Sequence, residues 1–462
     1  MNAGLHEQRA ALAARITRLA RGPRQPHRRF VIGGATYADL YATAAGIRRR
    51  LFSFGRPENV IVATEDRRLL MAALLAGLTG SFTVLLPHAL SPRALSRLHD
   101  LTGCRVGIGD QPDVFPPGTR VLAPGALAEP GPDEALDTTP DPDRVWVRLF
   151  TGGSTGRPQM CTKTPRSLLG EALYLAETFG LDSGDRVVAA VPPYHIYGLL
   201  YAVLAPFAAS AAVLNERPFF PGEIEGAVAA HAATALVAAP IHYRALRNSP
   251  LAHGGLRMAF SSASMLPEED NAAFCRKTGA PVFEVYGSTE TGGVASRCRA
   301  RGQTAFQAFA AVDWKIHDGH LLVRSDFLSP EPDRDADGFV KVGDRARRDG
   351  KGGFFLLGRS DGIVKVAGKR VDLEDIREKI IAIDGVRDVV VLALPHSGQR
   401  ENTIAVVAAG EVAAEKIRAS LSDRLEAHAL PRRIVIVSDI PFTHTGKTDR
   451  HAIKRLLHQK RS

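Results

Sequence analysis

The N-terminal part of the chain alternates short apolar segments with longer amphipathic ones, and this alternation constrains the fold more than any other feature. Residues 30–32, 59–63 and 81–86 are short and apolar, whereas residues 37–52 and 69–78 carry apolar side chains at helical spacing. Strands that alternate with helices predict a mainly parallel sheet with helices on both faces. We therefore expect an α/β fold.

The pattern changes twice along the 462 residues, a length that allows more than one domain. Beyond residue 311 short strands and turns replace the alternation. After a break at Gly358 a small unit follows, in which strands and two helices predict a compact α+β domain. We predict a large N-terminal domain of layered α/β sheets over residues 1–358 and a small α+β domain over residues 359–462.

Composition narrows the class of protein. The net charge of +10 is compatible with nucleic acid, an anionic membrane or an anionic metabolite. The basic residues are scattered, however, and neither a zinc pattern nor a basic cluster interleaved with aromatics is present, so no nucleic-acid partner is expected. Four cysteines without a CxxC pair indicate free thiols in a reducing cytoplasm. No apolar run reaches the roughly 18 residues of a membrane span.

A loop rich in glycine and hydroxyl side chains, LFTGGSTGRPQMCTK, occupies residues 149–163 between a predicted strand and a helix that resumes near Ser167. Glycines let the backbone approach a ligand closely, and the hydroxyls add donors to the exposed N–H groups. This combination suits a phosphate chain. The candidate phosphate contacts are Thr151, Gly152, Gly153, Ser154, Thr155 and Gly156. For an isolated loop, a flexible surface turn is the alternative.

Polar residues also follow other predicted strands. Residues 186–191 run into Tyr194 and His195, and residues 281–285 run directly into the segment Tyr286-Gly-Ser-Thr-Glu290. In open α/β sheets ligands collect at the carboxyl ends of strands. A carboxylate there, Glu290 beside Thr289, can hold Mg²⁺ while the metal bridges phosphate oxygens, although a strand-terminal glutamate can also be an exposed cap.

Three further residues in the C-terminal third have the chemistry of a nucleotide site. Asp344 could accept hydrogen bonds from a ribose diol, and Arg359 could contact ribose or phosphate; either could equally be a turn residue. Lys447 lies in a Gly-Lys-Thr sequence, but Pro441 occupies the position where a Walker loop needs its first glycine. Lys447 can still deliver a cation to a phosphorus centre.

Together and in this order, these segments resemble the adenylate-forming (AMP-binding) superfamily of acyl- and aryl-CoA synthetases, adenylation domains and luciferases. TGGSTGRPQ is similar to its phosphate loop, YGSTE to its metal-binding motif, VGD to its ribose motif, GRSDGIVKVAGKR to its hinge region and PFTHTGKTDR to its catalytic-lysine motif. The resemblance covers essentially the whole chain, although the N-terminal part is shorter than in typical members.

The resemblance implies ATP and Mg²⁺ as cofactors, with CoA or phosphopantetheine as the co-substrate thiol. The implied catalytic residues are Lys447, Glu290, Thr289 and His195, with Glu290 as the metal ligand. The implied ATP-binding residues are Thr151, Gly152, Gly153, Ser154, Thr155, Gly156, Tyr286, Gly287, Asp344 and Arg359. Asp361 matches the hinge of the C-terminal domain, Gly368 the loop that lines the thiol tunnel, and Arg370, more weakly, a phosphate contact.

One residue departs from the family pattern. The phosphate loop of the family usually ends in Pro-Lys, whereas this chain has Pro158-Gln159. Arg157 and Lys163 are possible substitutes for the missing lysine. How the pyrophosphate side is held is therefore open.

The substrate is expected to be a small-molecule carboxylic acid. Amino-acid-activating members carry an aspartate near residues 194–197, and its absence here argues against an α-amine. Tyr197, Phe219 and Tyr243 are candidates for the lining of a flat pocket; the alternative is that they belong to the core, where aromatic residues often lie. The resemblance of His195-Ile-Tyr197 to hydroxycinnamate- and benzoate-activating ligases favours an aryl acid; a medium-chain fatty acid is the alternative.

Two choices stay open at this point. The acceptor could be CoA or the phosphopantetheine arm of an acyl carrier protein, to which a basic surface would fit. A noncatalytic nucleotide sensor on the same fold is the alternative from another class; it would not need Glu290 and Lys447, and both are present.

Overall fold

The computed structural model describes residues 2–127, 139–151, 159–249, 255–359, 362–366, 369–395, 402–422, 424–443 and 448–458. The chain divides into two compact units. The large unit comprises Met1–Asp313 and Arg324–Gly338, and the small unit comprises Trp314–Val323 and Phe339–Ser462. The boundary predicted at residue 358 falls inside the small unit, and its role as the limit of a moving domain stays a prediction.

The first sheet of the large unit has six strands in the order β4-β3-β1-β2-β5-β6. All neighbours are parallel except β5 and β6, which form an antiparallel pair. The strands are β1 (Asn59–Ala63), β2 (Thr83–Leu86), β3 (Val106–Gly109), β4 (Arg120–Leu122), β5 (Val147–Thr151) and β6 (Gln159–Lys163). The accompanying helices are α2 (Tyr37–Ser53), α3 (Arg67–Gly80) and α4 (Pro92–Thr102), with 3₁₀ turns η1 (Pro112–Val114) and η2 (Pro124–Leu127).

The second sheet of the large unit has seven strands in the order β13-β12-β11-β10-β9-β7-β8, parallel from β8 to β11 and antiparallel beyond. Its strands are β7 (Arg186–Ala189), β8 (Ala212–Val213), β9 (Ala235–Ala238), β10 (Met258–Ser261), β11 (Val282–Ser288), β12 (Gly292–Arg297) and β13 (Gln307–Ala308). The helical elements are α1 (Asn2–Arg21), α5 (Pro165–Thr178), α6 (Ile196–Leu199), the π-helical turn η3 (Leu200–Leu204), α7 (Ala205–Ala209), α8 (Pro221–Ala230), α9 (Pro240–Ala245), η4 (Leu246–Asn248), α10 (Glu268–Thr278) and η5 (Arg299–Arg301).

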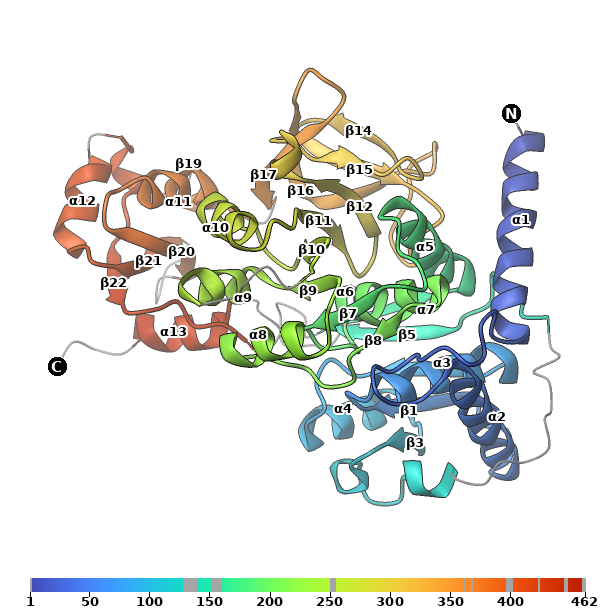
Figure 1. Ribbon diagram of the computed structural model, residues 1–462. Coiled ribbons are helices and arrows are strands. Elements are labelled where there is room, and N and C mark those ends of the chain that lie inside the picture. The colour runs from blue at the N-terminus through green and yellow to red at the C-terminus, as the bar shows by residue number, and fades with distance from the viewer. Residues whose placement is uncertain are drawn as a thin grey trace. The chain divides into compact units, whose positions relative to one another are not determined.

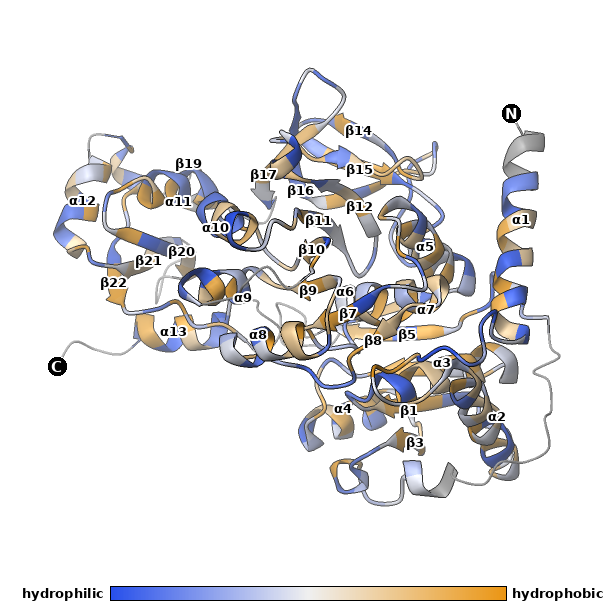
Figure 2. Cartoon of the chain, in the orientation of Figure 1, coloured by the Kyte–Doolittle hydropathy of each residue, from blue (hydrophilic) through white to orange (hydrophobic). Residues whose placement is uncertain are grey.

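Hydrophobic burial explains how these layers hold together. The helix α3 is apolar on all sides, and every residue from Leu69 to Thr79 is buried, as expected for a helix enclosed by other elements. In Figure 2 its ribbon is mainly orange. The core on one face of the second sheet joins β7, β9 and β10 to α8, α9 and α10. The helix α5 contacts both α1 and β12, and Figure 1 shows α5 and α1 running side by side.

The described residues of the small unit form three sheets. The first has the order β14-β15-β16-β17, with β14 (Asp313–His317), β15 (His320–Arg324), β16 (Val340–Arg348) and β17 (Phe354–Arg359). The second is the hairpin of β18 (Ile363–Val366) and β19 (Lys369–Asp372), and the third pairs β20 (Val386–Pro395), β21 (Asn402–Gly410) and β22 (Arg433–Val437). The helical elements are α11 (Leu373–Ile381), α12 (Ala414–Ser422), the 3₁₀ turn η7 (Ala427–Ala429) and α13 (Arg450–His458).

The predicted fold class is confirmed: the chain is a mixed α/β protein with mainly parallel sheets and a small α+β part at the C-terminal end. One local prediction was wrong. Residues 30–32 form no strand but only the single bridge Val31↔Val213, because the chain turns directly at Gly33 and Gly34. The sequence analysis did not predict β4, whose three residues pair with β3.

Candidate active site

The predicted phosphate loop connects two paired strands. The last strand before it, β5, ends at Thr151, and β6 begins at Gln159, with Thr151 paired to Gln159 across the hairpin. Thr151 is partly buried at the end of the strand. Gly152, Gly153, Ser154, Thr155, Gly156 and Arg157 lie outside the described residues, so their predicted phosphate contacts stay predictions. The antiparallel pairing fixes both ends of the loop at the edge of the sheet.

The second predicted site segment is the hairpin turn between β11 and β12. Tyr286 and Gly287 lie near the end of β11, where the register shifts between them. A Cβ atom on Gly287 would lie 2.2 Å from the carbonyl oxygen of Gly292, so the two strands can approach this closely only with glycine there. Thr289 and Glu290 occupy the turn and are partly exposed. The carboxylate predicted to hold Mg²⁺ is therefore accessible.

The backbone of this turn is fixed by hydrogen bonds from several sides. The Cys161 thiol, on β6, donates to the Thr289 carbonyl oxygen at 3.2 Å and lies 2.9 Å from the Ser329 hydroxyl. The Ser329 N–H in turn donates to the Glu290 carbonyl oxygen at 2.8 Å. Within the turn, the Thr291 hydroxyl accepts the Ser288 N–H at 3.0 Å. The strand that leaves the glycine loop is thus bonded to the segment that carries the predicted metal ligand.

Beneath the turn lie two buried charged side chains. Glu171, on α5, is fully buried, and its Oε1 accepts the Gly293 N–H at 2.6 Å. Lys163, at the end of β6, is also fully buried, and its ammonium donates to the Phe327 carbonyl oxygen at 2.9 Å. Burial raises the pKa of Glu171 to about 7 and lowers the pKa of Lys163, while the attraction between the two charges opposes both shifts.

This geometry corrects one expectation. Lys163 was a possible substitute for the lysine that usually ends the phosphate loop, but its side chain has no exposed surface and its ammonium is bonded to the Phe327 carbonyl. A lysine enclosed in this way holds protein backbone rather than a nucleotide phosphate. Gln159, by contrast, is exposed at the start of β6.

Glu171 was not singled out from the sequence, although a signal for it exists. The helix expected near Ser167 carries the apolar residues Leu168 and Ala172, and Glu171 follows Leu168 by one turn, on the same face. A carboxylate on the apolar face of a helix is unusual. Cys161 and Ser329, which hold the turn, gave no such signal.

His195, Tyr197 and Tyr243 lie on or near the helical segments that follow β7 and β9. His195 directly precedes α6, is partly buried and has the Tyr194 ring beside it, with 4.7 Å between ring centroids. The Tyr197 hydroxyl donates to the Ala238 carbonyl oxygen at 3.0 Å, and that side chain keeps some exposure. Tyr243 is fully buried in the core, where its hydroxyl donates to the Phe260 carbonyl oxygen at 2.7 Å. Its predicted place in the acyl pocket stays a prediction, and its burial gives it a part in the core.

Within the small unit, the two predicted ribose residues are neighbours. Asp344 on β16 and Arg359 on β17 are directly opposite each other in the antiparallel pair. The Arg359 guanidinium lies over Gly343, since a Cβ atom there would be 3.0 Å from its Nη2. Asp344 is partly buried and Arg359 is exposed. A diol could contact both from one side of this sheet.

Three other predicted residues of the small unit, Asp361, Gly368 and Lys447, lie outside the described residues, and nothing of the Arg370 side chain is described. Among the described residues that follow Gly368 in the sequence, Asp372 accepts the Glu374 N–H at 3.0 Å and so caps α11. Asp372 also forms an ion pair with Arg345. The roles of the three residues stay predictions.

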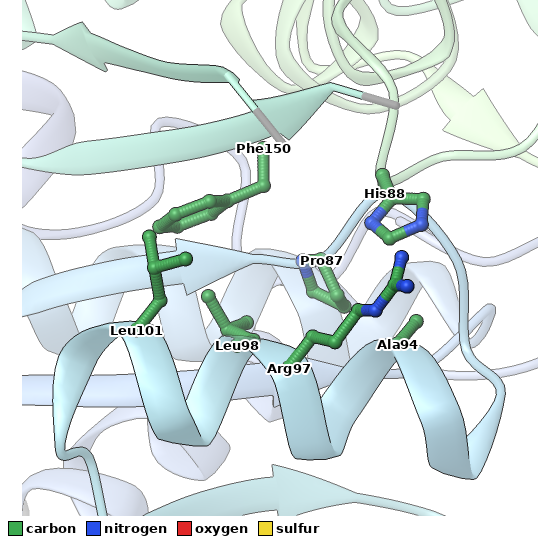
Figure 3. A pocket seen from close by; sticks show the side chains of 7 residues that line it. All are labelled: Pro87, His88, Ala94, Arg97, Leu98, Leu101 and Phe150. Carbon is green, nitrogen blue, oxygen red and sulfur yellow. The ribbon is translucent and has the colours of Figure 1, made fainter. Parts of the chain in front are cut away.

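A small pocket lies beside the strand that enters the glycine loop. Figure 3 shows it between α4 and β5, with the rings of Phe150 and His88 and the guanidinium of Arg97 among its lining groups. The lining residues are Pro87, His88, Ala94, Arg97, Leu98, Leu101 and Phe150. None of the predicted site residues lines it.

Comparison with known proteins identifies the chain. The model of the AMP-binding enzyme family matches residues 19–323, and that of the AMP-binding enzyme C-terminal domain matches residues 376–447. The chain belongs to the AMP-binding enzyme family. The predicted resemblance is thereby confirmed. Among the described helices, none is both long and apolar enough to cross a membrane.

Relatives of the chain are CoA ligases, which confirms the predicted enzyme class, an AMP-forming acid–thiol ligase. A sulfoacetate–CoA ligase of Cupriavidus necator is 26% identical over 73% of each chain. A 3-hydroxybenzoate–CoA/4-hydroxybenzoate–CoA ligase of Thauera aromatica is 25% identical over 91% of this chain and 92% of its own. The crystal structure of ATP-bound MatB from Rhodopseudomonas palustris superposes with a TM-score of 0.82 at 22% identity, covering 96% of this chain and 98% of its own.

Proposed function

We propose that this enzyme activates a carboxylic acid, with an aryl acid favoured, by ATP-dependent formation of an acyl-adenylate and then transfers the acyl group to CoA. The observation that carries the proposal is the bond from the Cys161 thiol to the Thr289 carbonyl oxygen, 3.2 Å long. It joins the strand leaving the glycine loop to the turn that carries Glu290. This bond supports a site in which the proposed phosphate loop and the proposed metal ligand act together.

In the first half-reaction, a carboxylate oxygen of the substrate attacks the α-phosphorus of ATP, and pyrophosphate leaves. Residues 151–156 would cradle the phosphates, with Thr289 and the segment Tyr286-Gly287 beside them. Lys447 would stabilise the negative charge that develops at the α-phosphate. Asp344 and Arg359 would hold the ribose.

Glu290 would hold Mg²⁺, which when bound neutralises charge on the phosphates and orients them. The described residues contain no cluster of three or more potential metal ligands. A single accessible carboxylate fits this ion, because Mg²⁺ is usually bound by one or two carboxylates together with substrate phosphates and water.

In the second half-reaction, the thiolate sulfur of the acceptor attacks the acyl carbonyl carbon, the C–O bond to phosphate breaks, and AMP leaves. We place the moving part at residues 359–462, turning about Asp361, with Gly368 lining the path of the thiol and His195 gating the access to the adenylate. Closure would also exclude water from the reactive anhydride.

An aryl acid is favoured by two features. The hydroxybenzoate-activating relative covers nearly the whole chain, and Tyr197 keeps partial exposure next to His195. A medium-chain fatty acid is the second candidate. An acyl carrier protein is the second candidate for the acceptor, and the net charge of +10 would suit an acidic carrier.

The test is pyrophosphate release from Mg-ATP across benzoates, cinnamates, fatty acids, amino acids and sulfoacetate, each with and without CoA. We expect release with one class of aryl acid, and stimulation by CoA. Pyrophosphate release that CoA does not stimulate would indicate that a carrier protein, rather than CoA, accepts the acyl group. Silence across the panel, together with retained ATP binding, would contradict the proposal and favour a noncatalytic nucleotide sensor.

Lys447→Ala separates the two half-reactions. Loss of the cation should lower adenylation by about 10²–10³-fold, the typical effect of removing one transition-state contact. Thiolation of a supplied acyl-adenylate should remain. The matched control is Lys454→Ala on the exposed side of α13, which should change neither step. Equal loss of both steps in Lys447→Ala would contradict the assigned role.

A further inference from the structure

Glu171 occupies a position where packing alone does not require a carboxylate. It lies fully buried on the apolar face of α5, and only Oε1 has a hydrogen-bond partner among the described residues, the Gly293 N–H at 2.6 Å. Removing a carboxylate from water costs several kcal/mol, and an apolar side chain of similar volume is often neutral or stabilising at such a place. Stability therefore does not explain this residue.

The β11–β12 hairpin is shaped around that carboxylate. Gly292 has a φ of +67°, and a Cβ atom on it would lie 2.4 Å from Glu171 Oε2. A Cβ atom on Gly293 would lie 3.0 Å from Glu171 Oε1. Two successive glycines thus let the hairpin backbone rest directly on the carboxylate. The contact begins two residues after Glu290.

Lys163 acts on the same turn from the other side. Its ammonium donates to the Phe327 carbonyl oxygen, and two residues further on the Ser329 N–H donates to the Glu290 carbonyl oxygen. Lys163 therefore fixes the segment that holds Glu290, whereas Glu171 fixes the strand that follows it. Lys163 also supplies the positive charge that lowers the electrostatic cost of burying Glu171.

We propose that Glu171 is a positioning residue for the proposed metal-binding turn, setting the place of Thr289 and Glu290 through its contacts with Gly292 and Gly293. The inference rests on the proposed function. In this proposal Glu171 contacts neither substrate nor metal. It orients Glu290, the carboxylate proposed to bind the metal. Residues that orient a metal ligand in this way commonly affect metal affinity about 10–100-fold.

The experiment compares Glu171→Leu, which keeps the volume, with Glu171→Gln, which keeps an acceptor for the Gly293 N–H. Calorimetric titration with ATP, in Mg²⁺ and in EDTA, gives the factor by which Mg²⁺ strengthens nucleotide binding. We expect Glu171→Leu to lower that factor about 10-fold or more and Glu171→Gln to keep it within about 3-fold. Affinity for ATP in EDTA should be unchanged in both.

The matched control is Asp270→Asn. Asp270 is also fully buried and accepts a hydrogen bond from Arg247 Nε at 2.8 Å, but this ion pair lies between α10 and η4, away from the turn. The Asp270→Asn substitution should lower the unfolding midpoint and leave the Mg²⁺ factor unchanged. If Glu171→Leu does not fold, Glu171→Asp takes its place, since the shorter side chain keeps the charge but no longer reaches Gly293.

A Glu171→Leu or Glu171→Asp variant that loses stability yet keeps the wild-type Mg²⁺ factor would overturn the inference, because Glu171 would then serve only the fold. Failure of the proposed function is a separate result. In that case no acid in the panel would release pyrophosphate with the wild-type enzyme, whereas the binding measurement would still read the Mg²⁺ factor. The two failures are therefore distinguishable.

Discussion

The buried carboxyl group of Glu171 makes the stability of the folded protein depend on pH. The pKa of Glu171 is raised by burial from its ordinary 4.5 to about 7, with the nearby Lys163 and the bond from Gly293 acting in the opposite direction. Because the folded state holds this proton more tightly than the unfolded state, Glu171 contributes stability that is fully present below about pH 4.5. That contribution is lost as the pH rises through 7.

Glu171→Gln should therefore remove part of the pH dependence of stability. Relative to this variant, the wild-type enzyme should lose about 1.4 kcal/mol for each pH unit between the two pKa values. The measurement is the urea midpoint of both proteins at pH 5, 6, 7 and 8. Curves that stay parallel across this range would show that Glu171 does not titrate there. Asp270→Asn serves as the control for loss of a buried carboxylate elsewhere.

Substitution of Tyr243 tests whether this residue lines the acyl pocket or serves only the hydrophobic core. Its hydroxyl is the donor to the Phe260 carbonyl in a fully buried place, so Tyr243→Phe should lower the unfolding free energy by about 1–3 kcal/mol, the cost of leaving a buried acceptor unsatisfied. The KM for the preferred acid should not change. Tyr197→Phe is the comparison, because Tyr197 keeps partial exposure. A several-fold rise in KM with Tyr243→Phe alone would instead place Tyr243 in the acyl pocket.

At the residue scale, the sequence assigned Asp344 and Arg359 a shared role at the ribose, and the structure adds that they are paired across two antiparallel strands. Lys163 was misassigned because sequence spacing cannot report burial: four residues beyond Gln159, it could as well have faced solvent. Glu171 could have been found as a charge on an apolar face. Cys161 could not, since only tertiary contact brings its thiol to Thr289.

At the scale of elements, the hairpin β11–β12 is the part of the site most sensitive to backbone change. Gly292→Ala places a side chain at positive φ and also against the Glu171 carboxylate. Gly302→Ala is a matched control, because Gly302 has a φ of +76° and nothing lies within 4 Å of its added Cβ atom. The strain of positive φ, about 1–2 kcal/mol, should therefore appear in both variants.

Gly292→Ala should lose about a further 1–3 kcal/mol by overpacking, and it should weaken the Mg²⁺ enhancement of ATP binding. Gly302→Ala should keep that enhancement. Unfolding midpoints and the calorimetric titration described above give both numbers. Equal losses of stability in the two variants would mean that the carboxylate moves aside at no cost.

Two of the strands that sequence reasoning missed, β6 and β12, share a physical cause. β6 and β12 are antiparallel strands that follow a turn directly, and neither is separated from its predecessor by a helix. The alternation of strand and helix, which predicted the parallel strands β1 and β2, has no signature for such a return. In β6 the sequence Gln-Met-Cys-Thr-Lys also lacks an apolar run: the Cys161 thiol bonds to the Thr289 carbonyl oxygen, and the Thr162 N–H bonds to the Glu331 carboxylate.

At the scale of the whole molecule, the proposed function requires two half-reactions from one set of residues. If the small domain over residues 359–462 turns about Asp361 between them, a substitution that stiffens the backbone there should separate the steps. Proline fixes φ near −65° and restricts the residue before it. Asp361→Pro should therefore lower one half-reaction about tenfold or more and leave the other nearly intact.

The control for that prediction is Asp361→Ala, which removes the carboxylate but leaves the backbone free to turn. Both half-reactions should survive in it, because rotation needs backbone freedom rather than the side chain. Adenylation is measured by pyrophosphate release and thiolation by CoA-dependent consumption of a supplied acyl-adenylate. If Asp361→Pro slowed both steps equally, or neither, while the protein remained folded, the turning point would have to lie elsewhere. Because each step has its own substrate, this comparison tests the motion independently of which acid the enzyme prefers.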